Sequence, residues 1–482
     1  MSGSPSSDPS AGPSVFSAAK SLAIAKFATQ ILSWVGTYYV ATVLMPKDYG
    51  LSAMATAFTQ FAQLFAEMGI GVTIIQRQNM PEKEVHNLFS FSLMLGAFCA
   101  VASFFLAYAG GWYFRRTDII PLTQFTAVVF LANALSIVPY NILNRDMRFR
   151  ERGWVDMYST FVSVAAQVTM AHAGWGAWSL ILGVGIRAVV RTAASFWYSK
   201  YVPSLQFNWG LVKRDLVFSL PVTFNGLLYV LKEKSIPLIL GRFFSATQLG
   251  YYALANTLSD IPNQKVVQIV REILLPMLSR RDQSGRVDGF FTALKFCTLF
   301  IVPVYIAGFY YGAPILEAIF PAKWGAMAEI FAGLCLVQIF IVFISIGTIY
   351  ATAGGRPILS TYAEVSLALL IPGATFAFHM LPLNTLPYVW AVVHLVVFAV
   401  WIFALMRGAG NFLWRLLGLN LQVAGVCVAV VAADYALFRF AHLDRFGHAQ
   451  VLAFVRAGAY LVAYSGFVYL FHREFLLGLR KK

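Results

Sequence analysis

Long apolar runs separated by short polar breaks repeat along almost the whole chain. Fourteen runs approach the length of about 20 residues that an α-helix needs to cross a bilayer. They lie at about 17–43, 50–75, 88–110, 119–141, 154–173, 175–198, 215–240, 248–270, 290–311, 325–352, 358–381, 384–406, 414–437 and 450–471. Several runs also carry polar residues at steps of three or four, which is the period of one helix face. The pattern predicts an all-α, polytopic integral membrane protein with about fourteen transmembrane helices.

One pattern of turn and helix occurs twice, because residues 45–55 are echoed by residues 245–255. In each copy an apolar run ends, a short turn containing Gly follows, and a second apolar run begins. Polar positions then recur at the same offset, with Thr56, Gln60, Gln63 and Glu67 matched by Asn256, Asp260, Asn263 and Val267. Polar residues inside a bilayer are costly and should not recur without a role. The repeat predicts a duplicated bundle with a substrate site between its halves.

Composition and charge narrow the class of protein. The 482 residues are 59% hydrophobic and 12% charged, and the mean hydropathy of +0.69 is too high for a soluble protein. A net charge of +15 would suit nucleic acid, but the basic residues are not gathered into a soluble domain. They fit the positive-inside rule when both termini are cytoplasmic. We therefore expect a multi-pass membrane protein with cytoplasmic termini and no nucleic-acid partner.

Motifs typical of enzymes are missing from the sequence. It contains neither a GxxxxGK[ST] phosphate loop nor an HExxH metal motif. The four cysteines stand alone inside apolar runs, which predicts core residues. The longest connection, at about 271–289, is short for an extramembrane catalytic domain. The sequence favours a transporter over an enzyme and predicts no metal and no bound cofactor.

Charged residues inside the apolar runs are the candidate chemistry. A charge at mid-bilayer costs about 2.5–3.5 kcal/mol, so it normally faces a wet cavity or a partner. Basic and amide residues share helix faces with aromatic residues, which suits a cationic cavity for an anionic, sugar-bearing substrate. The candidates for substrate binding are Lys26, Gln30, Arg187, Arg191, Asn225, Lys232 and Lys234. The alternative is that these charges form salt bridges within the protein, with Lys232–Glu233–Lys234 partly neutralising itself.

Three acidic residues allow a coupling hypothesis. Glu67 and Asp260 lie on the repeated polar stripes, and Glu364 lies inside a later apolar run. Each could exchange a proton or bind sodium and so couple transport to an ion gradient. A carboxylate paired with Lys or Arg explains each of them equally well.

Four stretches of the chain resemble one known family. They are residues 44–51 together with 63–70, then 143–149, 241–255 and 276–280. The sequence is similar there to bacterial polysaccharide and O-antigen flippases of the Wzx type, in the multidrug/oligosaccharidyl-lipid/polysaccharide (MOP) exporter superfamily. The resemblance covers about residues 17–290. Where family members often carry an acid such as Asp in the seventh span, this chain has Lys232, Glu233 and Lys234.

The resemblance implies a fold, a substrate and a location. The fold is two pseudo-symmetric six-helix bundles, 17–200 and 201–410, followed by two more helices in 411–482. Apart from the resemblance, the Ser-, Pro- and Gly-rich composition of residues 1–16 predicts a disordered cytoplasmic tail. The substrate is an undecaprenyl-pyrophosphate-linked oligosaccharide, flipped across the bacterial inner membrane by alternating access. Membrane lipids, a polysaccharide polymerase and a chain-length regulator are the further candidate partners.

Other functions share some of these features. A membrane-embedded polysaccharide polymerase or glycosyltransferase would need a large extramembrane loop. A drug exporter of the same superfamily usually expels cations and needs an acidic cavity. A lipid II flippase shares the fold and is separated from a polysaccharide flippase only by substrate assays.

Overall fold

Every element that the structure describes is helical. The described part of the chain contains α-helices and one short 3₁₀ helix and no strand, which confirms the all-α prediction. The computed structural model describes residues 15–67, 70–77, 79–407, 411–440, 449–473 and 475.

The chain divides into two compact units, Met1–Val230 and Leu231–Lys482, with the boundary inside helix α8. The first seven helices are α1 (Val15–Val43), α2 (Pro46–Glu67), α3 (Ile70–Gln76), α4 (Glu82–Phe114), α5 (Ile119–Arg145), α6 (Phe149–His172) and α7 (Ala177–Ser199). They are followed by α8 (Trp209–Phe243), α9 (Ala246–Ser279), α10 (Gln283–Phe300), α11 (Val302–Ile319), η1 (Ala322–Trp324), α12 (Met327–Ala353), α13 (Pro357–Ala377), α14 (Leu386–Leu405), α15 (Phe412–Phe440) and α16 (Ala449–Phe471). The predicted boundaries at residues 200 and 410 stay predictions.

Each of the fourteen predicted segments overlaps one helix or two consecutive helices. The segment predicted at 50–75 covers α2 and α3, and the one at 290–311 covers α10 and α11. Among the described residues, nine stretches are long and apolar enough to cross a membrane. A multi-pass membrane protein is therefore confirmed, whereas the count of fourteen crossings stays a prediction.

The long helices outside those nine stretches are α1, α2, α6, α8 and α9. The repeated turns join α1 to α2 and α8 to α9, and α6 carries several charged residues near its start. A helix with such charges is poorly suited to face lipid on every side. The charged start of α6 therefore needs protein or water around it.

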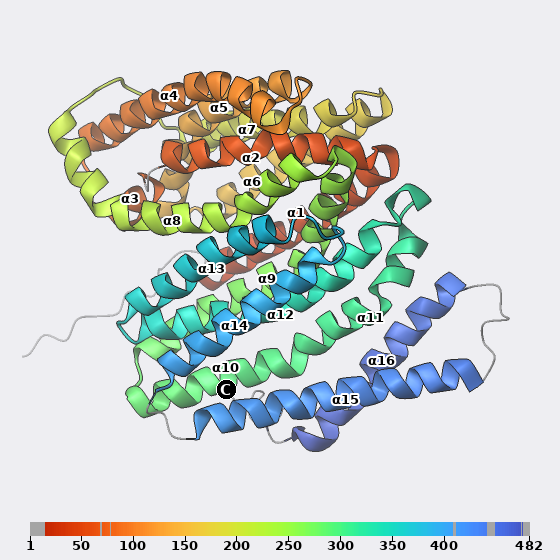
Figure 1. The fold of residues 1–482 in the computed structure, drawn as a ribbon. Coiled ribbons are helices and arrows are strands. Elements are labelled where there is room, and N and C mark those ends of the chain that lie inside the picture. Colours follow the sequence, from red (N-terminus) through yellow and green to blue (C-terminus); the bar gives the residue numbers. More distant parts are fainter. Residues whose placement is uncertain are drawn as a thin grey trace, which may run out of the picture. The chain divides into compact units, whose positions relative to one another are not determined.

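Small residues let the helices of each unit pack closely. In Figure 1 the long helices of each unit run alongside one another. In the first unit, a Cβ atom added to Gly96 on α4 would lie 2.3 Å from the Cβ atom of Ala134 on α5. In the second, a Cβ atom at Gly347 on α12 would lie 2.2 Å from the Trp401 ring on α14. Such contacts stabilise helix pairs in a membrane, where lipid tails are as apolar as the side chains.

The repeated turns have matching hydrogen bonds. In the first copy the Met45 N–H donates to the Asp48 carboxylate at 3.0 Å, and in the second the Ser245 N–H donates to Gln248 Oε1, also at 3.0 Å. Four residues into each second helix, the burial also matches: Gly50 and Gly250 are both buried. This local geometry supports the predicted repeat.

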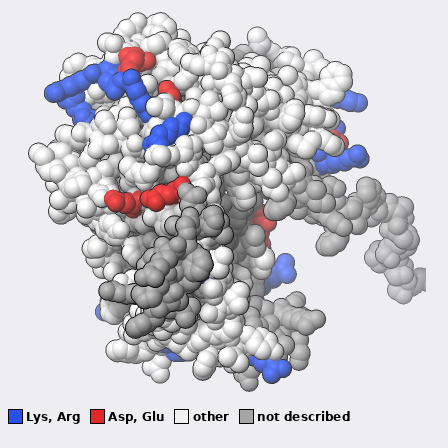
Figure 2. Space-filling view, turned by 90° about the vertical axis from the view of Figure 1, so that its right-hand side faces the viewer, with Lys and Arg blue, Asp and Glu red and all other residues white. Residues whose placement is uncertain are grey.

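The surface agrees with a membrane protein. Figure 2 shows a face that is mostly free of charged side chains, with Lys, Arg, Asp and Glu in a few small groups. Large apolar side chains such as Trp112, Val392 and Val462 are exposed. The four cysteines are all free and buried, as predicted.

Candidate functional site

A polar cluster in the first unit surrounds Tyr140, which is buried near the end of α5. The Tyr140 hydroxyl donates to both carboxylate oxygens of Asp156 on α6, at 3.0 and 3.1 Å. The same hydroxyl accepts a hydrogen bond from Arg152 Nε at 3.0 Å. On α7, the guanidinium carbon of Arg191 lies 4.0 Å from the centre of the Tyr140 ring. One tyrosine therefore joins three helices and holds a cation against its ring.

The Tyr140 cluster carries an excess of positive charge. Arg187 lies one helical turn before Arg191 and is exposed. Within the described residues, neither arginine forms an ion pair, and the buried Nε of Arg191 has no hydrogen-bond partner. With Arg152 included, three guanidinium groups stand against the single carboxylate of Asp156. An excess of two positive charges on membrane helices favours an anion, and the guanidinium fork matches phosphate oxygens.

Close contacts between helices fix where these arginines point. Ser163 Oγ on α6 donates to the Gly183 carbonyl on α7 at 2.8 Å, and Thr192 Oγ1 on α7 donates to the Ala132 carbonyl on α5 at 2.6 Å. A Cβ atom at Gly183 would lie 2.2 Å from Gln167, so the approach of α6 and α7 requires glycine there. These bonds hold α7 in one register against both neighbours and so position its two arginines.

Three of the predicted residues can be placed in the first unit. Arg187 and Arg191 lie together on α7, as their spacing predicts, whereas Gln30 is half-buried on α1 with no described contact to the Tyr140 cluster. The side chains of Lys26, Glu67 and Asn225 lie outside the described residues.

Sequence reasoning missed Tyr140, Arg152 and Asp156. A weak signal exists for one of them, because Asp156 is a carboxylate inside the segment predicted at 154–173, whereas Arg152 lies just before that segment. Nothing in the sequence connects either of them to Tyr140.

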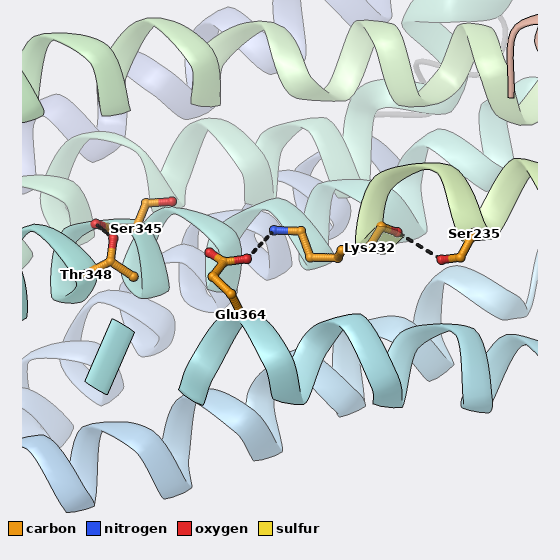
Figure 3. A network of polar contacts seen from close by, with 5 residues as sticks. All are labelled: Lys232, Ser235, Ser345, Thr348 and Glu364. Atoms are coloured by element: carbon orange, nitrogen blue, oxygen red, sulfur yellow. Dashed lines mark hydrogen bonds and ion pairs between the residues drawn. The ribbon is translucent and has the colours of Figure 1, made fainter. Parts of the chain in front are cut away.

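In the second unit, Lys232 on α8 forms an ion pair with Glu364 on α13. The Lys232 Nζ atom lies 3.2 Å from Glu364 Oε2, and Lys232 is only 9% exposed. Figure 3 shows the two side chains pointing toward each other, with Ser345 and Thr348 of α12 on the far side of Glu364. Two residues predicted for different roles, substrate binding and ion coupling, are therefore partners.

The surroundings of this pair are acidic. Glu233 and Lys234 follow Lys232 on α8 and are both half-buried. Glu233 is close enough to interact electrostatically with Lys232, Lys234, Asp260 and Glu364. Three carboxylates therefore stand against two ammonium groups, which is the opposite balance from the Tyr140 cluster. Lys232 and Lys234 as substrate ligands stay a prediction.

Asp260 belongs to a network of amides on α9 and α12. Its Oδ1 accepts from Asn263 Nδ2 at 3.3 Å, and its Oδ2 accepts from Gln264 Nε2 at 2.6 Å. Asn263 Nδ2 also donates to Gln338 Oε1 on α12 at 2.8 Å. Asn263 and Gln338 are 6% and 3% exposed, so their contact is buried between the two helices, whereas Gln264 is exposed.

The chain is similar in sequence to proteins of polysaccharide biosynthesis. The model of a family described as "Polysaccharide biosynthesis protein" matches residues 39–329. The succinoglycan biosynthesis transport protein ExoT of Rhizobium meliloti (strain 1021) is 23% identical over 62% of this chain. The teichuronic acid biosynthesis protein TuaB of Bacillus subtilis (strain 168) is 25% identical over 82% of this chain and 83% of its own length. The lipopolysaccharide biosynthesis protein WzxC of Escherichia coli (strain K12) is 23% identical over 67% of this chain.

These matches span 61% of ExoT and 66% of WzxC, which is less than two thirds of either relative. Solved structures show the same fold over more of the chain. Lipid II flippase MurJ in an inward closed conformation matches 94% of this chain with a TM-score of 0.78 at 15% identity. A multidrug resistance transporter of the MATE family, in the MOP superfamily, matches 81% with a TM-score of 0.60 at 16% identity.

Proposed function

The chain belongs to a family of polysaccharide biosynthesis proteins, and from that premise we propose that it is a flippase for a lipid-linked oligosaccharide. The substrate is an undecaprenyl-pyrophosphate-linked repeat unit of a surface polysaccharide. The protein carries it across the bacterial inner membrane, with both of its own termini in the cytoplasm, and catalyses no covalent step. The observation that carries the proposal is the Tyr140 cluster, which offers unpaired guanidinium groups to an anion inside a membrane fold.

The energetics of the crossing explain why such a cluster is needed. A pyrophosphate must leave the headgroup region, and each of its charges is expensive in a low-dielectric medium. A unit cation about 4 Å away offers roughly 4 kcal/mol at an effective dielectric of 20. Arg187 and Arg191 together therefore offset much of this cost without a covalent bond or a permanent trap. The glycan crosses through water-filled space within the protein, while the lipid tail stays in the hydrocarbon of the bilayer.

The alternative functions fit the structure less well. A drug exporter for cations does not suit three arginines facing one carboxylate. A lipid II flippase shares the fold, and its substrate also carries pyrophosphate. The two functions differ in the glycan that is carried. The lipid-linked unit that accumulates when the protein is inactive therefore distinguishes them.

Charge reversal at Arg191 tests the proposal. In a strain that lacks the native gene, Arg191→Glu should abolish surface polysaccharide, whereas Arg191→Lys should largely preserve it. Arg115→Glu, which changes an exposed loop arginine, is the matched control and should export normally. The readouts are surface polysaccharide, accumulated lipid-linked repeat units, and the amount of protein in the membrane. Normal export by correctly inserted Arg191→Glu would refute the role of the Tyr140 cluster. Accumulation of lipid II alone would identify lipid II as the substrate in place of the polysaccharide repeat unit.

A further inference from the structure

A group of basic residues lies where three helices of the second unit meet. Lys295 is on α10, Arg415 is in the first turn of α15, and His472 directly follows the last residue of α16. Lys295 is close enough to interact electrostatically with both Arg415 and His472. We call these three residues the Lys295 cluster, and the proposed transport function uses none of them.

Aromatic rings hold the two cations of the Lys295 cluster in place. Phe291 on α10 packs edge-on against Phe412 on α15, with 5.8 Å between the ring centres. The guanidinium carbon of Arg415 lies 4.3 Å from the centre of the Phe291 ring, and Lys295 Nζ lies 4.8 Å from the centre of the Phe475 ring. Figure 1 shows α10 and α15 running alongside each other. Both cations are therefore positioned mainly by aromatic contacts.

The protein neutralises this cluster poorly. Arg415 forms an ion pair with Asp288 at 4.0 Å, but the two side chains are 56% and 72% exposed, and such a pair contributes little. Within the described residues Lys295 forms no ion pair, and the side chain of Glu474 lies outside them. The buried Nε2 atom of His472 has no hydrogen-bond partner among the described groups. Two cations and one carboxylate leave an excess of one positive charge beside an unsatisfied ring nitrogen.

The surroundings of the Lys295 cluster suit the surface of a bilayer. The helices α15 and α16 are apolar enough to cross a membrane, yet only 22% and 17% of their apolar windows are buried, so most of their surface faces lipid. Trp414 beside Arg415 is 74% exposed, and Phe471 beside His472 is 67% exposed. Exposed aromatic residues next to basic residues at helix ends are typical of the depth of the lipid headgroups. The long stem of Lys295 lets its ammonium group reach that depth.

We propose that Lys295 and Arg415 bind the phosphate of an anionic phospholipid such as phosphatidylglycerol. A guanidinium fork and an ammonium group both suit phosphate oxygens, and basic pockets between membrane helices are a common place for anionic headgroups. The excess of one positive charge matches a phosphodiester, which carries one negative charge, better than a pyrophosphate. The headgroup would join α10 to α15 and to the end of α16, while the acyl chains stay in the bilayer.

This bridge has a structural purpose. Among the nine stretches that can cross a membrane, those in α15 and α16 are the least buried. Few side chains of the protein therefore hold these helices against the rest of the second unit. A phosphate shared between Lys295 and Arg415 would replace the repulsion between the two cations by an attraction of each to the same anion. The bound lipid should therefore stabilise the protein.

Thermal unfolding of the full-length protein in detergent tests the proposal. Phosphatidylglycerol, at roughly a hundredfold excess over its dissociation constant, should raise the melting temperature by about 2–3 °C above that in phosphatidylcholine with the same acyl chains. Phosphatidylcholine is the reference because its choline group cancels the charge of its phosphate. Glycerol 3-phosphate distinguishes a free phosphate from a lipid headgroup, and it should give no shift because it does not enter the bilayer or the detergent micelle.

Substitutions locate the binding site. The double variant Lys295→Gln/Arg415→Gln should lose the difference between the two lipids, whereas Lys295→Arg should keep it because the charge remains. The matched control Lys83→Gln/Lys213→Gln removes two exposed lysines of the first unit and so changes the net charge equally. It should respond to phosphatidylglycerol as the wild type does.

Three results would overturn the inference. One is wild-type protein with equal melting temperatures in the two lipids, and another is wild-type protein that glycerol 3-phosphate stabilises as well as phosphatidylglycerol does. The third is a Lys295→Gln/Arg415→Gln variant that still distinguishes the two lipids. A folding defect cannot obscure the first two results, because they need no variant. None of the measurements involves export, so this inference goes beyond the proposed function and does not depend on it.

Discussion

Lys232 has two possible roles that an exchange of charges can separate. It is paired with Glu364 in a nearly buried position, yet its sequence position also suggested a substrate ligand. Lys232→Glu alone sets two carboxylates against each other. We expect this variant to lower the free energy of unfolding by about 2–3 kcal/mol. This is somewhat less than for a fully buried pair, because Glu364 keeps 29% of its side chain exposed.

The double variant Lys232→Glu/Glu364→Lys restores opposite charges at the same two positions. We expect it to recover both protein abundance and polysaccharide export, measured side by side with each single variant. Recovery of abundance without export would instead assign a substrate contact to the ammonium group at position 232.

The residue scale also shows where sequence reasoning stops. Arg187 and Arg191 are recognisable because both belong to one helix and are four residues apart. Tyr140 is not, because its contacts with Asp156 on α6 and Arg191 on α7 depend on how the three helices pack, which a hydropathy pattern does not show. Likewise, a charged residue in the seventh or the eleventh segment can be identified, but the pairing of Lys232 with Glu364 depends on how α8 and α13 pack.

At the scale of elements, close helix contacts make a prediction about glycine. Gly347 on α12 faces the ring of Trp401, which is held by a hydrogen bond from its Nε1 to the Leu359 carbonyl at 2.8 Å. Gly347→Ala should destabilise the protein by about 1–3 kcal/mol, because the ring has to move. Gly373→Ala on α13, where a Cβ atom meets nothing within 4 Å, should be neutral or stabilise by up to about 1 kcal/mol.

Thermal unfolding in detergent, with both variants prepared in parallel, measures this difference. Equal melting temperatures for Gly347→Ala and the wild type would mean that α12 and α14 are not packed as closely as described.

The elements themselves follow well from the sequence, because apolar length alone identifies them. The breaks inside them are harder to predict. The segment at 290–311 looks continuous, yet α10 ends at Phe300 and α11 begins at Val302 with Pro303 in its first turn. Proline cannot donate a backbone hydrogen bond, so it favours a helix start at this point. Hydropathy carries no information about backbone hydrogen bonding, and the two helices merge into one apolar run.

At the scale of the whole molecule, the stretch from 201 to 208 connects α7 to α8, and side chains of α4 hold it. Asn87 accepts from the Asn208 N–H and donates to the Asn208 carbonyl, while Ser90 Oγ accepts from the Gln206 N–H at 2.9 Å. Asn87→Ala removes two of these bonds. We expect a several-fold faster cleavage of this stretch in limited proteolysis, because the freed backbone opens more often.

Ser103→Ala is the control for this experiment, since Ser103 is buried on the same helix and its Oγ donates to the Ala100 carbonyl of that helix. It should be cleaved at the wild-type rate. Equal rates for the two variants would show that Asn87 does not restrain the connection.

The repeated turn at Met45 and Ser245 has a historical consequence. Two copies that keep the same hydrogen bond in the turn after their sequences have drifted apart point to an ancestral gene of half the length, later duplicated and fused. Fusion freed each copy to specialise, since a change in one was no longer imposed on the other. The two copies now differ in charge, since the first has amides at 60 and 63 and an acid at 67, whereas the second has an acid at 260 and an apolar residue at 267. A product of the ancestral gene would have had to assemble as identical pairs, in which every gain of charge appeared twice.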